Sequence, residues 1–396
     1  MTDQAVVAGV GMIPFTKPGK SDPYDVMGAE AARRALADAG VGYEDVQQAY
    51  AGYVFGDSTS GQKALYRLGQ TGIPVINVNN NCSTGSSALF LARQAVESGT
   101  ADVALAVGFE QMLPGAIQPA FPDRPGALEL FEQVRDRVRG VPDAKVPNAA
   151  TFFGAAGAQY VEEQGIDPSV FAHITVKSRR HAAGNPYAVF RDPLTFEEVM
   201  ASPPIYGPLT RFQCCPPTCG AAAAVLVSQQ YARRHGLRAE VVIAGQALAT
   251  DFTSTFDGDM KRLIGYDMTA SAARTVYEQS GVGPEDVKVV ELHDCFTTNE
   301  FLTYEALGLT PEGTAEKFVL DGDNTYGGRV VTNPSGGLIS KGHPLGATGL
   351  AQCAELVWQL RGQAESRQVD GVTAALQQNL GLGGACVVTM YQKAGA

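Results

Sequence analysis

The chain alternates short apolar runs with helices made of small residues. Apolar runs at 6–10 and 221–227, and a short, mainly apolar run at 75–78, predict strands. Two stretches that begin with small residues, 86–97 and 347–360, predict helices that other backbone can approach closely. Strands that alternate with helices predict an α/β fold with parallel strand pairing.

The order of strand, helix, glycine and strand occurs twice. Residues 31–46 contain Ala-Ala-Arg, Gly-Val-Gly and Glu-Asp-Val, and residues 272–287 repeat these letters at a constant offset of 241. An apolar run precedes each copy, at 6–10 and at 241–244, and a predicted strand follows, at 48–55 and at 288–292. A repeat of this length indicates two similar domains rather than a solenoid.

Between the copies lies a segment rich in proline and scattered charge, with few strand-like apolar runs. We expect this segment to be an insertion that covers part of the fold. The predicted division is 1–112 with 206–237 as the N-terminal half, 113–205 as an inserted loop domain, and 238–396 as the C-terminal half.

Charge and composition exclude several classes of protein. The 396 residues include 30 Lys and Arg against 41 Asp and Glu, a net charge of −11, which argues against nucleic acid or an anionic membrane as the main partner. No apolar stretch is long enough to span a bilayer, so we expect no integral membrane contact. Residues 1–4 show no secretory pattern and the seven cysteines are odd in number, which predicts reduced thiols and a cytoplasmic location.

Cys82 stands where a predicted helix begins, directly after the run at 75–78. The positive end of a helix dipole and its unpaired N–H groups lower the pKa of a thiol and favour the thiolate. Cys82 is therefore a candidate nucleophile. The alternative is a packed core cysteine, which is the usual role of a cysteine in a buried helix.

His343 opens the second small-residue helix. An offset of 261 lays Cys82 on His343 and Gly85 on Gly346, so the two helices are counterparts in the two halves. In a pair related by pseudo-twofold symmetry their N-termini can meet at the centre, which brings an imidazole next to a thiol for Cys–His activation. The alternative is a capping or core histidine.

Further candidates follow a strand of the second half. His293 and Cys295 stand at the end of the predicted strand 288–292 and can reach a cleft. A zinc pair is the alternative, but no second close pair completes a site, and we expect no bound metal. The glycine-rich turn at 379–384 either binds an oxyanion or is a plain turn. Three further cysteines are interpreted as structural thiols: Cys214, Cys215 and Cys219.

Taken together, these segments resemble the thiolases. The resemblance rests on Asn-Cys at 81–82, His-Asp-Cys-Phe at 293–296, Gly-His-Pro at 342–344 and the glycine-rich turn, and it is closest to the sterol-carrier-protein-2-type thiolases. It covers about residues 6–391 and leaves no room for a sterol carrier domain. It implies two βαβαβαββ halves in a five-layer α/β/α/β/α stack with an inserted loop domain, in a homodimer or tetramer.

The resemblance implies a 3-ketoacyl-CoA thiolase of fatty-acid or sterol side-chain degradation, with coenzyme A as co-substrate and no bound cofactor. Cys82 would carry the acyl group and His343 would activate its thiol. His293 and His343 would bracket the oxygen of the leaving enolate, and the backbone N–H groups of Cys82 and Gly381 would bracket the acyl oxygen. Straight, branched and sterol side chains all stay open as substrates.

The sequence departs from the thiolase pattern in two places. Asn379 occupies the position of the second catalytic cysteine of ordinary thiolases, while Cys386 lies beyond the turn and is expected to be a bystander. The acid/base role then passes to Cys295, whose pKa we expect the neighbouring His293 to lower. The second departure is Cys219, which replaces the usual Asp.

Three other functions compete with this interpretation. A condensing enzyme of the ketoacyl-synthase type shares a Cys-His-His set, but the His-Asp-Cys-Phe segment argues against it. A thiolase-like retro-aldolase that acts with a partner protein would not need the nucleophile Cys82. A non-catalytic lipid or acyl-CoA binding protein would not need three reactive groups in matched positions.

Overall fold

The computed structural model describes residues 4–114 and 123–395; residues 1–3, 115–122 and 396, which the sequence analysis included, lie outside it. Ten strands form one mixed sheet in the order β10-β9-β11-β12-β8-β1-β7-β4-β2-β3. The strands of the first half are β1 (Val6–Met12), β2 (Gln48–Gly52), β3 (Val75–Val78), β4 (Val103–Glu110) and β7 (Gly220–Val227). The strands of the second half are β8 (Val241–Ala249), β9 (Val289–Glu291), β10 (Val331–Thr332), β11 (Ala374–Gly381) and β12 (Ala385–Lys393).

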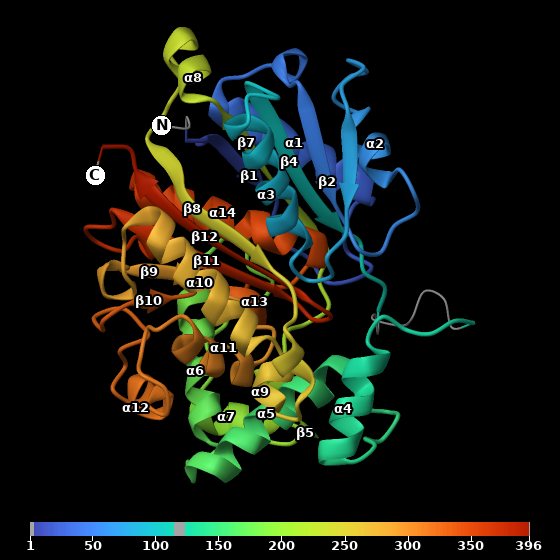
Figure 1. Cartoon of the computed structure of the whole chain (residues 1–396), viewed down its shortest axis with the longest axis vertical. Helices are drawn as coiled ribbons and strands as arrows, with labels where there is room; N and C mark the ends of the chain where they lie inside the picture. The colour runs from blue at the N-terminus through green and yellow to red at the C-terminus, as the bar shows by residue number, and fades with distance from the viewer. Residues whose placement is uncertain (1–3, 115–122, 396) are drawn as a thin grey trace.

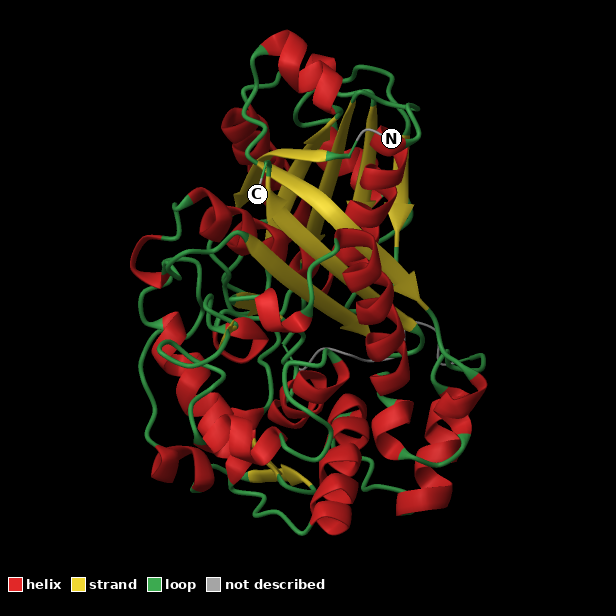
Figure 2. Cartoon of the chain, turned by 60° about the vertical axis from the view of Figure 1, so that its left-hand side comes forward, coloured by secondary structure: helices red, strands yellow, loops and turns green. Residues whose placement is uncertain are grey.

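The two halves of the sheet join at β1 and β8, through the single register pair Val6 and Val242. Figure 2 shows the strands as a twisted yellow surface between red helices. The five strands of each half agree with the predicted duplication. Strand β2 ends at Gly52, whereas the sequence predicted a strand over 48–55. The N–H groups of Val54 and Phe55 donate to the carboxylate of Glu110 instead of to a neighbouring strand.

Helices cover both faces of each half and produce the five layers. The helices of the two halves are α1 (Tyr24–Ala39), α2 (Ser60–Leu65), α3 (Thr84–Glu97), α8 (Gln229–His235), α9 (Met260–Leu263), α10 (Tyr266–Ser280), α11 (Thr297–Ala306), α12 (Ala315–Leu320), α13 (Gly337–Ser340) and α14 (Leu345–Arg361). Helix α1 packs on one side of the first half, α10 packs on one side of the second, and α3 and α14 lie between the halves. The predicted α/β fold class is confirmed.

The central helices α3 and α14 touch through their backbones. A Cβ added to Gly85 would lie 2.7 Å from the carbonyl oxygen of Gly346, and one on Gly346 would lie 2.5 Å from the carbonyl oxygen of Phe109. Only glycine allows this approach. The contact explains the small residues that both helices carry, and it brings the two helix N-termini together at the centre of the molecule.

The inserted segment, which separates the two copies of the repeat along the chain, is mainly helical. Its elements are α4 (Glu129–Arg139), α5 (Asn148–Gln164), α6 (Val170–Ala182), α7 (Phe196–Met200) and a hairpin of β5 (Pro204–Tyr206) and β6 (Leu209–Thr210). In Figure 1 this segment lies below the second half, next to α9 and α11. Phe153 of α5 stacks on Phe296, with ring centroids 5.0 Å apart, so the insertion packs directly against the His-Asp-Cys-Phe segment. Among the helices described, none combines the length and the apolar character needed to cross a membrane.

Candidate active site

Cys82 lies in a tight turn just before α3. Asn81 adopts a left-handed conformation with φ of 51°, and the N–H of Ser83 bonds the carbonyl oxygen of Asn80 at 3.1 Å. The amide of Asn81 donates to the carbonyl oxygen of Leu382 at 2.9 Å, which fixes this turn to the glycine-rich turn of the second half. Gly381 packs against the same turn, since a Cβ there would lie 2.8 Å from Ser83 Oγ.

His343 lies in the turn before α14 and is buried. Its Nδ1 lies 2.7 Å from Thr348 Oγ1, and that hydroxyl donates to the carbonyl oxygen of Pro344 at 3.0 Å. A hydroxyl has one proton, so Thr348 accepts from His343 and the proton of the neutral ring is on Nδ1. His343 Nε2 is buried and has no hydrogen-bond partner, so its lone pair is free to accept a proton.

His293 follows the end of β9, where the chain leaves the sheet. The side chain of Asn333 accepts from the N–H of Leu292 at 2.9 Å, which ends the strand. The N–H of His293 is bound by the side chain of Gln378 at 3.0 Å. Asn379 Nδ2 lies 3.0 Å from His293 Nδ1.

The structure brings Cys82, His293 and His343 together. One ring nitrogen of each histidine and the sulfur of Cys82 lie within 4.8 Å of one another. The two imidazole rings meet edge to face, with centroids 5.0 Å apart. This spacing could hold a metal ion, but the donation by Asn379 to His293 Nδ1 leaves the proton of the neutral ring on Nε2. Metal-binding histidines instead donate from their second nitrogen, so these surroundings do not suit a metal.

Burial sets the protonation of the three groups. It lowers the pKa of His343 to about 3, and burial together with the charge of His343 lowers the pKa of His293 well below its ordinary value. Burial and the nearby carboxylate of Glu110 raise the pKa of Cys82 to about 12. The prediction that the helix N-terminus lowers the pKa of this thiol is therefore wrong, because desolvation outweighs the helix dipole.

Glu110 is a buried carboxylate between the two halves that the sequence analysis missed. It ends β4 and accepts three backbone hydrogen bonds, from Val54 at 3.1 Å, Phe55 at 2.9 Å and Gly346 at 3.0 Å. Burial raises its pKa to about 7. The sequence signal was a carboxylate at the end of an otherwise apolar run, where a charge is costly unless it is bonded.

Cys295 is buried next to this cluster. Its carbonyl oxygen accepts from the N–H of Cys215 at 2.9 Å. Burial raises the pKa of Cys295 well above its ordinary value, and the thiols of Cys215 and Cys82 add to the rise. The expectation that His293 lowers this pKa is wrong, since a neutral, buried imidazole carries no charge with which to stabilise a thiolate.

Cys386 lies on the face of β11 and β12 that points away from the clustered side chains. Asn379 faces Cys82, and successive strand residues alternate between faces. Cys386 pairs in register with Leu380, so it lies on the face away from Asn379, and Thr269 of α10 is 3.4 Å from its sulfur. Cys219 is buried and donates to the carbonyl oxygen of Met112 at 3.4 Å.

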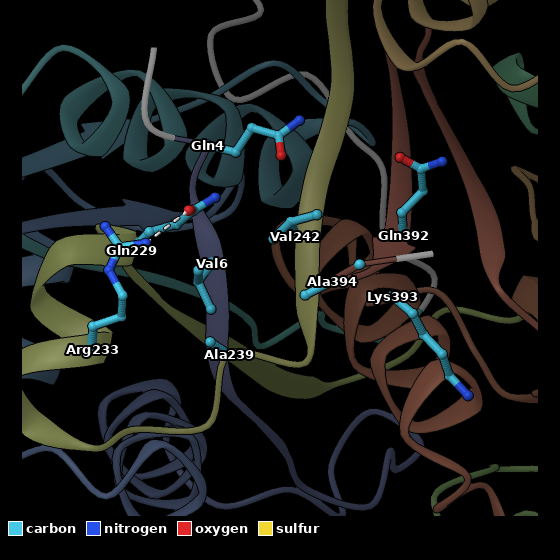
Figure 3. Close-up of a pocket in the computed structure, with 10 residues that line it drawn as sticks. Gln4, Val6, Gln229, Arg233, Ala239, Val242, Gln392, Lys393 and Ala394 are labelled. Atoms are coloured by element: carbon cyan, nitrogen blue, oxygen red, sulfur yellow. Dashed lines mark hydrogen bonds between the residues drawn. The ribbon is translucent and has the colours of Figure 1, made fainter. Parts of the chain in front are cut away.

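A separate pocket of about 300 Å³ lies at the joint between the halves, far along the chain from the three clustered side chains. Val6 and Val242 line it, where β1 and β8 meet (Figure 3). Arg233 donates to Gln229 at 3.4 Å along its rim. The pocket contains none of the candidate site residues.

Comparisons with known proteins agree with this fold. Two family models match the chain: "Thiolase, N-terminal domain" over residues 5–230 and "Thiolase C-terminal domain-like" over residues 251–391. The chain belongs to the thiolase family.

Among its relatives, sterol carrier protein 2 of Rattus norvegicus is 53% identical over 391 residues, which are 98% of this chain and 71% of the relative. The benzoylsuccinyl-CoA thiolase subunit BbsB of Thauera aromatica is 38% identical over 384 residues, covering 96% of this chain and 94% of that protein. The solved Ltp2–ChsH2(DUF35) aldolase superposes with a TM-score of 0.84 at 26% identity, over 98% of both chains.

Proposed function

We propose that the chain is a 3-ketoacyl-CoA thiolase that works through an acyl-Cys82 intermediate. The main support for this proposal is the cluster of Cys82, His293 and His343, in which the Cys82 sulfur and one ring nitrogen of each histidine lie within 4.8 Å of one another. The thiolase family models and the thiolase named among the relatives support acyl-CoA chemistry. Coenzyme A is the proposed co-substrate.

In the first half-reaction the sulfur of Cys82 attacks the 3-keto carbon while its proton passes to His343 Nε2. The bond between the α- and β-carbons of the substrate breaks, and the electron pair moves into the thioester as an enolate. His293 Nε2–H and the newly protonated His343 Nε2–H donate to the enolate oxygen. The thiol of Cys295 gives its proton to the enolate carbon, and acetyl-CoA or propionyl-CoA leaves.

In the second half-reaction the thiolate of Cys295 takes the proton of the CoA thiol. The CoA sulfur attacks the acyl-Cys82 carbonyl, whose oxygen is bound by the backbone N–H groups of Cys82 and Gly381. Collapse of this intermediate releases acyl-CoA, and Cys82 recovers its proton from His343. The raised pKa of Cys295 suits a group that first acts as an acid.

The test is CoA-dependent cleavage over a panel of straight and 2-methyl-branched 3-ketoacyl-CoAs, with the acyl-enzyme trapped and weighed by mass spectrometry. Cys82→Ala should form no adduct and no product. Normal thiolysis by Cys82→Ala would contradict the mechanism.

The aldolase neighbour favours one second candidate, a retro-aldol cleavage. That reaction needs a base and an enolate site but no covalent cysteine, so it would survive in Cys82→Ala. Cleavage of a 3-hydroxyacyl-CoA without added CoA, at equal rates in the wild type and Cys82→Ala, would select the aldolase.

We further propose a homodimer through the outer edge of β3. Within the described sheet, β3 pairs on one side only, with β2. Ile76 of this strand is 37% exposed, and the nearby Tyr66 is 55% exposed. The free thiols around Cys82 suit a reducing compartment, and we propose the cytoplasm.

A further inference from the structure

The Nδ1 atoms of the two clustered histidines have hydrogen-bond partners of opposite kind, an acceptor for His343 and a donor for His293. His343 Nδ1 faces the hydroxyl of Thr348, which accepts, whereas His293 Nδ1 faces the amide of Asn379. Both rings are neutral near pH 7, because burial lowers the pKa of each. A neutral imidazole has one N–H and one lone pair, so the partner of Nδ1 decides what Nε2 offers to a substrate.

The orientation of Asn379 is fixed by its neighbours. One amide atom lies 3.2 Å from the carbonyl oxygen of Cys82, which can only accept, so this atom is the nitrogen. The other amide atom is then Oδ1, and it accepts from Ser86 Oγ at 2.9 Å.

A second backbone carbonyl fixes the same direction from the other end. Gln377 lies 2.7 Å from the carbonyl oxygen of Gly349, so its atom there is Nε2. That nitrogen donates to Ser86 Oγ at 2.8 Å, and Ser86 passes its own proton on to Asn379. Two carbonyls that can only accept therefore force both protons of the Asn379 amide toward Cys82 and His293.

We propose that Asn379 is a positioning residue that holds His293 in its Nε2–H tautomer, while Thr348 holds His343 in its Nδ1–H tautomer. His293 then presents a proton donor to the reacting oxygen, and His343 presents a lone pair to the thiol of Cys82. The roles of electrophile and base are assigned before substrate arrives. This inference rests on the proposed function for its catalytic meaning, and on the hydrogen bonds alone for the tautomers.

The proposal gives a reason for asparagine in the glycine-rich turn. An amide nitrogen can donate to the backbone of Cys82 and to His293 together, whereas a carboxylate has only oxygens there. Asn379→Asp would place an acceptor next to Nδ1 and draw the proton of His293 to that atom. Nε2 would then carry a lone pair and could no longer donate to an enolate.

The first measurement reads the tautomers without activity. Enzyme labelled with ¹⁵N-histidine gives two-bond ¹⁵N–¹H correlation patterns that distinguish Nδ1–H from Nε2–H, and the chain has only five histidines. We expect opposite patterns for His293 and His343, assigned by their loss in His293→Gln and His343→Gln. The same tautomer on both rings of the wild-type enzyme would overturn the proposal.

The second measurement is the pH profile of turnover in Asn379→Asp. At pH 8 we expect kcat to fall by about 10²-fold with little change in KM, as for loss of one oxyanion donor. Toward lower pH the new carboxylate stabilises the imidazolium of His293, Nε2 regains its proton, and kcat should recover relative to wild type. The titratable groups in or next to this cluster in the variant are His343, Cys82, Cys295 and the new carboxylate, and the wild-type profile controls for the first three.

Ser86→Ala is the matched control, because it removes the hydroxyl on Oδ1 but leaves the carbonyl oxygen of Cys82 to orient the amide. We expect its His293 to keep the Nε2–H pattern. An Asn379→Asp enzyme whose His293 pattern is unchanged, or whose loss of kcat is independent of pH, would refute the positioning role. Correct tautomers in an enzyme without thiolysis would refute the proposed function alone.

Discussion

The resting state of Cys82 is the sharpest physical consequence of the site. Burial and Glu110 hold its pKa near 12, and burial holds the pKa of His343 near 3. A thiolate–imidazolium pair is therefore disfavoured in the free enzyme, unlike the ion pairs of many Cys–His sites. The proton should leave Cys82 only as the sulfur attacks a bound carbonyl.

The expected rate of alkylation follows from these values. At pH 8 a thiol with a pKa of about 12 is thiolate in roughly 1 molecule in 10⁴, against about a quarter for an ordinary cysteine of pKa about 8.5. The more basic thiolate is intrinsically about 40-fold more nucleophilic, for a Brønsted slope of about 0.45. Cys82 should thus react with iodoacetamide about 10²-fold more slowly than an exposed cysteine.

The assay treats the folded protein with iodoacetamide from pH 6 to 9.5 and measures by mass spectrometry how fast the peptide that contains Cys82 becomes carbamidomethylated. A reference cysteine peptide is treated in the same way. The rate should rise about tenfold for each pH unit without levelling off. His343→Asn should leave this profile unchanged while slowing acyl transfer by about 10²–10⁴-fold. A plateau between pH 6 and 8 in the wild type, lost in His343→Asn, would show a resting ion pair and refute the reasoning.

Three further predictions concern other groups. Burial raises the pKa of Glu110 to about 7, so protonated Glu110 contributes about 3 kcal/mol to the free energy of unfolding below about pH 4.5, and this contribution is lost as the pH rises through 7. The denaturation midpoint should therefore fall more between pH 5 and pH 8 in the wild type than in Glu110→Gln, and an equal fall in both proteins would contradict the prediction. Cys295→Ala should acylate Cys82 slowly and retain the adduct when CoA is added, whereas Cys386→Ala should turn over normally; the reverse pattern would move the acid/base role to Cys386. Ile76→Lys should shift the protein from dimer to monomer in light scattering, and an unchanged mass would place the interface elsewhere.

Patterns within short stretches of sequence predict much of the fold and the meeting of helices α3 and α14 at its centre. The repeat at 31–46 and 272–287 predicted two βαβ halves, and small residues after Cys82 and His343 predicted helices that could meet. Both inferences depend on features that neighbouring residues carry themselves. The strand at 75–78 was predicted with its observed bounds for the same reason.

The protonation of the site depends on contacts between distant segments, which a linear pattern does not contain. The pKa of Cys82 is raised by burial between the halves and, to a smaller extent, by Glu110, so a rule based on the helix dipole gave the wrong direction. The role proposed for Asn379 depends on a carbonyl oxygen almost 300 residues earlier in the chain, and its sequence neighbourhood shows only a glycine-rich turn. The helices of the insertion lacked strand-like runs and were interpreted as loop.

The crossing of α3 and α14 has a consequence for how activity arises during synthesis. The proposed nucleophile, Cys82, is translated early, whereas its proposed base at position 343 and the proposed positioning amide at 379 belong to the last stretch to be translated. Each half contributes only part of the cluster: Cys82 comes from the first half, and His293 and His343 come from the second. A chain that ends before residue 343 is therefore expected to lack the proposed thiolysis.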